Sequence, residues 1–236
     1  MASLDSMEYK KLAAKGDVRQ VRSDTPIAVR LKYVGTGTVT SVTTTTATNI
    51  VMITSDGGTD TYAFATYDTV GKLVDAINAD GIFKAKVLDT VRSEATASQF
   101  VDGAISAGTE DGTTYYDVKV DTSAADYFAV RLTHDRGFDG EERKKSHRIH
   151  LQEIIYSMDI STAAADGVKI YFVNGSTETL KMDALSVDTT ATTINFASGN
   201  GYLSCNNGED IVVKIDDGGN LADAAGNYLR VVGLLE

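Results

Sequence analysis

Short stretches of alternating apolar and polar residues, separated by turn-forming residues, recur through most of this chain. Residues 27–34, for example, place Ile27, Val29 and Leu31 on one side of an extended backbone, because successive side chains of a strand point to opposite faces. Residues 35–55 are rich in valine, isoleucine and threonine, which favour extended backbone because they are branched at Cβ. The sequence therefore predicts a mainly β protein.

Two turn signals mark β-hairpins within this pattern. Asp56-Gly57-Gly58 and Asn174-Gly175 each lie between two strand-like stretches. Glycine adopts the positive φ that tight hairpin turns need, and asparagine tolerates it better than most residues. We therefore predict one hairpin at each of these positions.

Residues 66–89 depart from the two-residue period. Their large apolar residues are spaced as on one face of an α-helix, at Val70, Leu73, Val74 and Ile77. Asp68 or Thr69 can serve as the N-cap, and Gly81 stands where a left-handed residue ends a helix. The sequence predicts one short helix over about residues 68–80, followed by a strand. Because so short a helix does not persist alone in water, we expect it to lie on the sheet.

The patterns divide the chain into four parts. Residues 1–25 have few large apolar groups and no sustained period, which predicts an N-terminal arm, either exposed to solvent or lying across a neighbouring subunit. Residues 26–135 predict an α+β module, a β-rich domain with the helix. Residues 136–148, the densest run of charge, predict a connector. Residues 149–236 contain only strand patterns with intervening turns, which predict a β-sandwich or jelly-roll-like domain.

The overall charge restricts the partners. The formal net charge is −11, so the chain repels phosphate backbones and we expect no nucleic-acid partner. No apolar run reaches the roughly 18 residues needed to cross a bilayer, so we expect no membrane partner. The first residues lack the apolar core of a secretory signal, and Cys205 is the single cysteine. These features are typical of a protein made in a reducing cytoplasm.

Metal-binding patterns are weak. His147 and His150 lie near each other, but strand alternation places them on opposite faces, and no cysteine pair accompanies them or His134, so we expect no zinc site. A glycine-rich stretch near the C-terminus offers oxygen ligands as weak calcium candidates. They are Asp216, Asp217, Asn220 and Asp223. Their spacing does not match an EF-hand, and such residues are also common in turns. We expect no cofactor.

The sequence contains no recognisable set of catalytic residues. It has no G-x-S-x-G motif, and Cys205 lies in a strand-like stretch where a small buried apolar residue is the usual outcome. No pair of carboxylates stands out among the 33 acidic residues. Residues 34–40 are glycine-rich but lack the length and the lysine of a phosphate-binding loop. We therefore expect no enzymatic activity.

Residues 56–89 resemble a module of known proteins. Their sequence, DGGTDTYAFATYDTVGKLVDAINADGIFKAKVLD, is similar to a β-hairpin, a T-x-x-x-L-V-D-A-I-N helix and a strand found in structural proteins of tailed bacteriophages. The C-terminal residues, rich in threonine, glycine and asparagine, are similar in character to capsid-decoration, fibre and baseplate proteins. The resemblance implies a building block and carries no catalytic residue.

The resemblance implies a virion structural protein, assembled in the host bacterial cytoplasm. A capsid decoration or cement protein of the head is the first expectation, and a tail, neck or baseplate component is the alternative. The implied partners are other virion proteins, above all the major capsid protein, and further copies of the chain, with a trimer as one candidate. Basic residues near the N-terminus are the expected anchor. They are Lys10, Lys11, Lys15, Arg19 and Arg22. A carbohydrate-binding module or surface adhesin also fits a sandwich, but the chain has no tryptophan to stack on a sugar.

Overall fold

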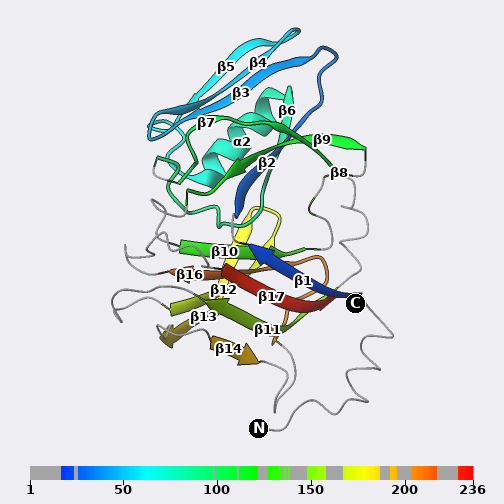
Figure 1. Cartoon of the computed structure of the whole chain (residues 1–236), viewed down its shortest axis with the longest axis vertical. Helices are drawn as coiled ribbons and strands as arrows, with labels where there is room; N and C mark the ends of the chain where they lie inside the picture. The colour runs from blue at the N-terminus through cyan, green and yellow to red at the C-terminus, as the bar shows by residue number, and fades with distance from the viewer. Residues whose placement is uncertain are drawn as a thin grey trace. The chain divides into compact units, whose positions relative to one another are not determined.

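The structure, a computed structural model, is mainly β with one short helix, as the alternating sequence predicts (Figure 1). The described residues are 17–23, 26–97, 99–110, 112–121, 127–133, 136, 138, 148–157, 167–186, 192–195, 203–216 and 228–235. The chain divides into two compact units. We call Thr25–Ala125 the inserted unit, and Met1–Asp24 together with Asp126–Glu236 the terminal unit.

The inserted unit contains two antiparallel sheets. The β2 sheet has the strand order β6-β2-β9-β8, and the β4 sheet has the order β5-β4-β3-β7. The strands of the β2 sheet are β2 (Ile27–Tyr33), β6 (Phe83–Val87), β8 (Ala107–Glu110) and β9 (Thr113–Lys119). The strands of the β4 sheet are β3 (Val39–Thr45), β4 (Asn49–Thr54), β5 (Gly58–Ala63) and β7 (Gly103–Ala104).

Helix α2 (Val70–Asp80) confirms the helix predicted over residues 68–80. Thr69 is its N-cap, and its side-chain oxygen accepts the N–H of Lys72 at 3.3 Å. Gly81 ends the helix with a φ of 77°, a left-handed conformation that glycine adopts without steric cost. The predicted apolar stripe is buried, and α2 lies against β6 and β2. A segment too short to persist as an isolated helix is therefore held by the sheet.

Strand β6 follows the helix with the alternation that the sequence predicts. Phe83, Ala85 and Val87 are buried, whereas Lys84 is exposed. The ring of Phe83 lies 5.4 Å from the ring of Tyr33 in β2, measured between centroids. Burial of these side chains joins β6 to the neighbouring strand through an apolar core as well as through backbone hydrogen bonds.

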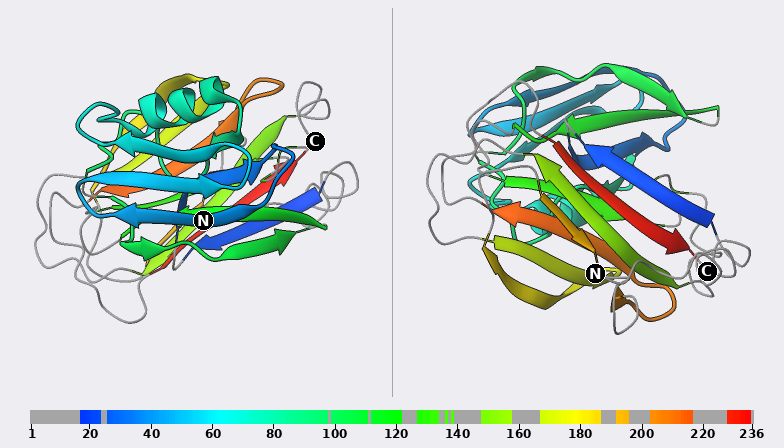
Figure 2. Two further views of the ribbon diagram at one scale, coloured as in Figure 1. Left: turned by 90° about the horizontal axis from the view of Figure 1, so that it is seen from above. Right: turned by 60° about the horizontal axis from the view of Figure 1, so that its bottom comes forward.

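The terminal unit contains two further antiparallel sheets (Figure 2). The β17 sheet has the order β1-β17-β11-β14, with β15 also paired to β11, and the β16 sheet has the order β10-β16-β12-β13. The strands of the β17 sheet are β1 (Asp17–Ser23), β11 (Ile149–Ser157), β14 (Thr192–Asn195), β15 (Leu203–Ser204) and β17 (Tyr228–Leu235). The strands of the β16 sheet are β10 (Tyr127–Leu132), β12 (Gly167–Asn174), β13 (Thr177–Ser186) and β16 (Asp210–Asp216).

The two sheets of the terminal unit pack against each other. A Cβ atom built on Gly233 of β17 would lie 2.6 Å from Cδ1 of Leu132 in β10, so glycine lets the two strands approach this closely without displacing that leucine. Ile154 of β11 and Val213 of β16 are fully buried. Two sheets that share one apolar core form a β-sandwich.

Both predicted hairpins are confirmed. In the β4–β5 hairpin Thr54 lies opposite Gly58, which has a φ of 79°. In the β12–β13 hairpin Asn174 lies opposite Thr177, and Gly175 has a φ of 58°. Glycine occupies the left-handed position of each turn, as the steric argument requires.

The division into units differs from the four parts that the sequence suggested. Strand β1 was expected in an arm over residues 1–25, but it pairs along its whole length with β17. Strand β10 was expected in the domain over residues 26–135, but it pairs with β16. A strand pattern predicts extended backbone without naming the partner strand, which explains both differences. Most of the expected connector, residues 136–148, lies outside the described residues.

Candidate interaction surfaces

One face of the β4 sheet carries only uncharged side chains. Alternation along β3, β4 and β5 sends every second side chain to this face, where each is half-buried or exposed. We call these residues the threonine face: Ser41, Thr43, Thr45, Asn49, Val51, Ile53, Thr59, Thr61 and Ala63. No Asp, Glu, Lys, Arg or His is among them. The face is therefore neutral in a chain whose formal net charge is −11.

The opposite face of the same sheet points into the inserted unit. Ile50, Met52 and Tyr62 are buried there. The hydroxyl of Tyr62 donates a hydrogen bond to Asp80, the last residue of α2, so the helix end lies on this inner side (Figure 1). Burial and the hydrogen bond to Asp80 raise the pKa of Tyr62. The inner side is thus occupied by the chain itself, and the threonine face is the side that remains for a partner.

The threonine face is apolar along its middle strand and polar along the two strands beside it. Its middle strand, β4, contributes Val51 and Ile53, whereas β3 and β5 contribute mainly hydroxyl-bearing residues. Strand register places Thr43 and Thr61 on either side of Val51. An apolar stripe with polar borders is the usual anatomy of a protein–protein contact, because the centre excludes water and the border hydrogen-bonds.

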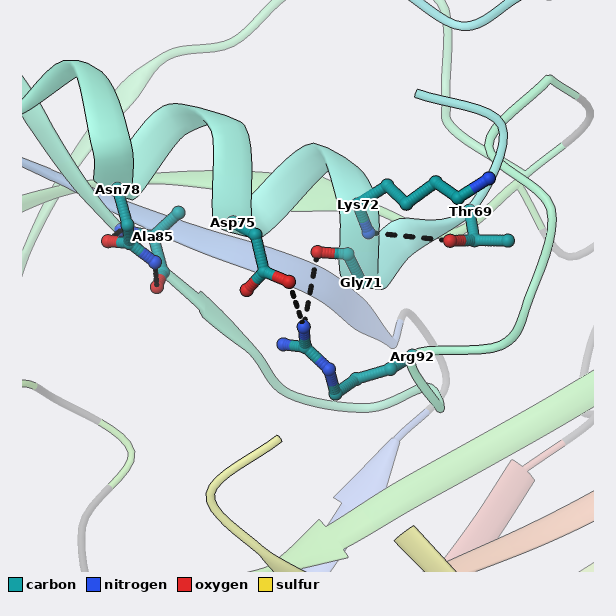
Figure 3. Close-up of polar contacts among 7 residues, drawn as sticks. All are labelled: Thr69, Gly71, Lys72, Asp75, Asn78, Ala85 and Arg92. Carbon is teal, nitrogen blue, oxygen red and sulfur yellow. Dashed lines mark hydrogen bonds and ion pairs between the residues drawn. The ribbon is translucent and has the colours of Figure 1, made fainter. Parts of the chain in front are cut away.

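One edge of the inserted unit is closed by the helix. The side-chain amide of Asn78 donates to the carbonyl oxygen of Ala85 and its oxygen accepts the N–H of Ala85, both at 2.9 Å (Figure 3). β6 is the edge strand of the β2 sheet, and the amide takes the place of one further strand residue. A covered edge does not recruit a strand from another molecule.

The edge strand β5 of the β4 sheet carries a charged residue that disfavours pairing with a strand of another molecule. Asp60 of β5 points to the inner side, opposite Met52. Burial, and to a smaller extent the neighbouring Asp80, raise the pKa of Asp60. Inward-pointing charged residues on edge strands are a common device against strand addition. The threonine face, and not this edge, is therefore the surface suited to contacts.

The N-terminus of α2 is also occupied by the chain itself. The N–H of Val70 donates to the carbonyl oxygen of Glu94 at 2.9 Å, and the N–H of Gly71 donates to that of Arg92 at 2.8 Å. The guanidinium of Arg92 lies 2.6 Å from Asp75, further along the helix (Figure 3). With its first amides already bonded, this helix end holds a loop in place.

The glycine-rich residues 34–40 bind a carboxylate of their own chain. The backbone N–H groups of Thr36 and Gly37 both donate to one oxygen of Asp56 at 2.8 Å, and the hydroxyl of Tyr33 donates to the other at 2.5 Å. The hydrogen bond from Tyr33, followed by the backbone donors, holds the pKa of Asp56 well below its usual range. The loop therefore fastens the β4–β5 turn to the end of β2.

A pocket of about 320 Å³ lies beside β7, β8 and β9. It is lined by Val101–Gly108, Asp117 and Lys119. Asp117 already accepts hydrogen bonds from Nε and Nη2 of Arg30, each at 2.8 Å, and Asp102 accepts the N–H of Thr46 at 2.9 Å. These carboxylates are engaged in structural contacts, and the remaining lining is mostly small residues.

In the terminal unit, charged side chains meet on one face of the β16 sheet. The guanidinium of Arg131 lies 3.4 Å from Asp210 and 4.0 Å from Glu178, on two other strands. The ammonium of Lys214 lies 4.7 Å from the ring centroid of Tyr127, a cation–π contact. Oppositely charged side chains from different strands are thus paired, and these pairs link the strands of the β16 sheet through side chains as well as through the backbone.

The structure places only part of the predicted anchor. Arg19 and Arg22 lie in β1, opposite Gly233 and Arg230 of β17. Lys10, Lys11 and Lys15 lie outside the described residues. The predicted arm thus contains a strand of the terminal unit, and the three lysines precede it along the chain.

The structure places only one of the weak calcium candidates. Asp216 is the last residue of β16, whereas Asp217, Asn220 and Asp223 lie outside the described residues. No group of three or more metal-binding side chains occurs among the residues that the structure describes. His150 is buried with Nδ1 2.6 Å from the hydroxyl of Ser204, and His134 and His147 also lie outside the description.

Cys205 occupies the kind of position that the sequence predicts. It is buried, and its thiol donates to the carbonyl oxygen of Glu209 at 3.2 Å. Burial raises the pKa of Cys205 to about 11. A thiol that stays protonated is a poor nucleophile, so this residue packs as a small apolar side chain.

Comparison with known proteins assigns no family. No protein-family model matches the chain, and no curated protein matches it. Within the described part of the chain, no helix is long and apolar enough to cross a membrane. The threonine face was not predicted from the sequence. Residues 35–55 contain no charged residue at all, so charge does not distinguish one side of strands β3 and β4 from the other.

Proposed function

We propose that this chain is a structural protein of a tailed-phage particle. A capsid decoration or cement protein, bound to the outside of the head, is the first assignment. A tail, neck or baseplate component is the second. Its partners are the major capsid protein or other virion proteins and further copies of itself, and it assembles in the host bacterial cytoplasm.

The observation that carries this proposal is the module over residues 56–89. These residues resemble a phage structural module in sequence, and they form the turn and second strand of the β4–β5 hairpin, the helix α2 and the strand β6 in that order. Two residues of the T-x-x-x-L-V-D-A-I-N motif have a structural role. Thr69, its first residue, caps the helix, and Asn78, its last residue, covers the edge of β6. The motif thus supplies both the cap that begins the helix and the side chain that joins the helix to β6.

The surfaces of the inserted unit also support a role in assembly. A neutral sheet face with an apolar centre suits contact with another protein. The closed edge of β6 and the charged inner side of β5 discourage uncontrolled strand addition, which a protein present in many copies must avoid. Both features favour a building block over a protein that acts alone on a small molecule.

The predicted anchor can be tested with particles assembled in the absence of this chain. Purified full-length chain is mixed with such particles, and occupancy is measured by co-sedimentation. We expect saturable binding, and we expect the triple variant Lys10→Glu, Lys11→Glu, Lys15→Glu to bind about 10- to 100-fold more weakly, since each lost charge pair removes about 0.5 to 1 kcal/mol.

A matched control carries the same change of charge elsewhere. Arg143→Glu, Lys144→Glu and Lys145→Glu alter the other basic cluster and should leave occupancy unchanged. Equal binding by both triple variants would exclude the lysine anchor. Failure of the unmodified chain to bind any part of the particle would exclude the proposed function itself.

A further inference from the structure

We propose that the threonine face docks against the threonine face of a second copy of this chain, in a contact with two-fold symmetry. This inference deepens the proposed function and rests on it, since it names the surface through which copies meet. Two properties of the face identify the partner: its charge and its pattern of hydrogen-bonding groups. The extent of the face sets the expected strength of the contact.

Charge favours a second copy over a charged partner. Each copy has a formal net charge of −11, so copies repel one another unless the surfaces that touch are neutral. The nine side chains of the threonine face carry no formal charge. A strongly basic or acidic partner would leave its own ions without counter-charges against this face, which is costly once water is excluded.

The arrangement of groups is complementary to itself. A two-fold contact requires that one surface match its own copy. Hydroxyl groups both donate and accept hydrogen bonds, so Thr43 and Thr61 can pair with the same residues of another molecule. The apolar stripe of Val51 and Ile53 runs along the middle strand, and a two-fold axis near it places stripe on stripe. Sheets packed in this way lie about 10 Å apart.

The extent of the face sets the expected strength. Three strands spaced by about 4.8 Å, with about six residues each rising about 3.3 Å, cover roughly 300 Å². A stable contact buries about 800 Å² on each partner, so this face alone gives a weak dimer. We expect a dissociation constant of about 0.1 to 1 mM in free solution, which is sufficient where copies are held side by side on a particle.

The contact can be tested by sedimentation equilibrium of the full chain over concentrations that span this range. We expect the unmodified chain to associate to dimers at the upper end. Val51→Lys and Val51→Glu, each at the centre of the face, should each remain monomeric, because a like charge is brought against itself across the two-fold axis. An equimolar mixture of the two variants should dimerise again, because opposite charges then meet.

A matched pair of variants controls for charge alone. Thr114 is exposed on β9, away from the threonine face, and Thr114→Lys and Thr114→Glu should leave the dimer unaffected. Unchanged far-ultraviolet circular dichroism shows that each variant is folded. A chain that stays monomeric at the highest concentration, or variants of Val51 that still dimerise, would overturn the inference. Failure of the mixture to recover would overturn the face-to-face geometry.

The two proposals fail in different ways. If the chain is found in particles but remains monomeric in solution at every concentration, the inference is wrong and the proposed function stands. If the chain dimerises through the threonine face but is never found in particles, the proposed function is wrong and the surface assignment stands.

Discussion

Asp56 shows how a single side chain can join three parts of the inserted unit. It lies in the β4–β5 turn and accepts hydrogen bonds from Tyr33, at the end of β2, and from Thr36 and Gly37, in the segment between β2 and β3. Gly37 makes this approach possible without displacing a neighbour, because a Cβ on it would lie 2.3 Å from the hydroxyl of Ser55. The stretch that resembles a phosphate-binding loop in composition is thus a clamp for an internal carboxylate.

Replacing this carboxylate should make the protein less stable, and the effect should depend on pH. The folded-state pKa of Asp56 is lowered, so its contribution is fully present above the unfolded-state pKa near 3.9 and is lost as the pH falls through the lower folded-state value. We expect Asp56→Asn to lower the melting temperature at neutral pH, with a smaller difference from the unmodified chain in strong acid. Thermal unfolding by circular dichroism measures both. A difference that is the same at every pH would contradict this role.

Cys205 should react slowly in the folded protein. Because its pKa is raised to about 11 from 9.0, the thiolate fraction near neutral pH is about a hundredfold lower than in the unfolded chain. We expect labelling by a thiol reagent to be at least that much slower in buffer than in denaturant, as followed by absorbance. Equal labelling rates in buffer and in denaturant would show that Cys205 is accessible to solvent in the folded protein.

At the scale of elements, the local features were predictable because they depend on residues a few positions apart. The helix boundaries follow from Thr69, the apolar spacing and Gly81, and each hairpin follows from a glycine in its turn. The cover that Asn78 provides for the edge of β6 was not predictable, because it depends on where the chain returns after Gly81. Nor was the threonine face, since alternation alone does not say which side of a sheet is covered.

The edge cover can be tested by removing the amide. Asn78→Ala leaves the N–H and carbonyl of Ala85 without this partner, and we expect the free energy of unfolding to fall by about 1 to 3 kcal/mol. Asn78→Asp keeps an acceptor but loses the donor. Its free energy of unfolding, measured by denaturant titration, should therefore lie between those of the unmodified chain and Asn78→Ala. A neutral effect of Asn78→Ala would show that water replaces the amide at this edge without loss.

At the scale of the whole molecule, the first and last strands that the structure describes, β1 and β17, pair with each other in the same sheet. Register places Asp17 opposite Leu235, so the terminal unit is completed only when the last strand has been made. Two stretches of sequence so far apart carry no sign of their pairing. Residues 1–25 have few large apolar groups and no sustained period, so the sequence predicts an arm there. The inserted unit, by contrast, is continuous in sequence and was recognised nearly whole.

Two truncations distinguish a strand from an arm. Removing residues 1–15 leaves β1 in place, and we expect the thermal stability of the chain to be unchanged. Removing residues 1–23 deletes β1, so the N–H and carbonyl groups of β17 that pair with it are exposed, and we expect faster hydrogen exchange in β17 and a lower melting temperature. Identical exchange in both truncated chains would show that β1 does not hold the sheet.

The central claim is that this chain is a part of a phage particle. The most direct test is quantitative mass spectrometry of purified particles made by the genome that encodes it, after density-gradient separation from soluble protein. The account predicts peptides of this chain in the particle fraction at a fixed ratio to the major capsid protein. Recovery of the chain only in the soluble fraction, with none in the particles, would contradict it.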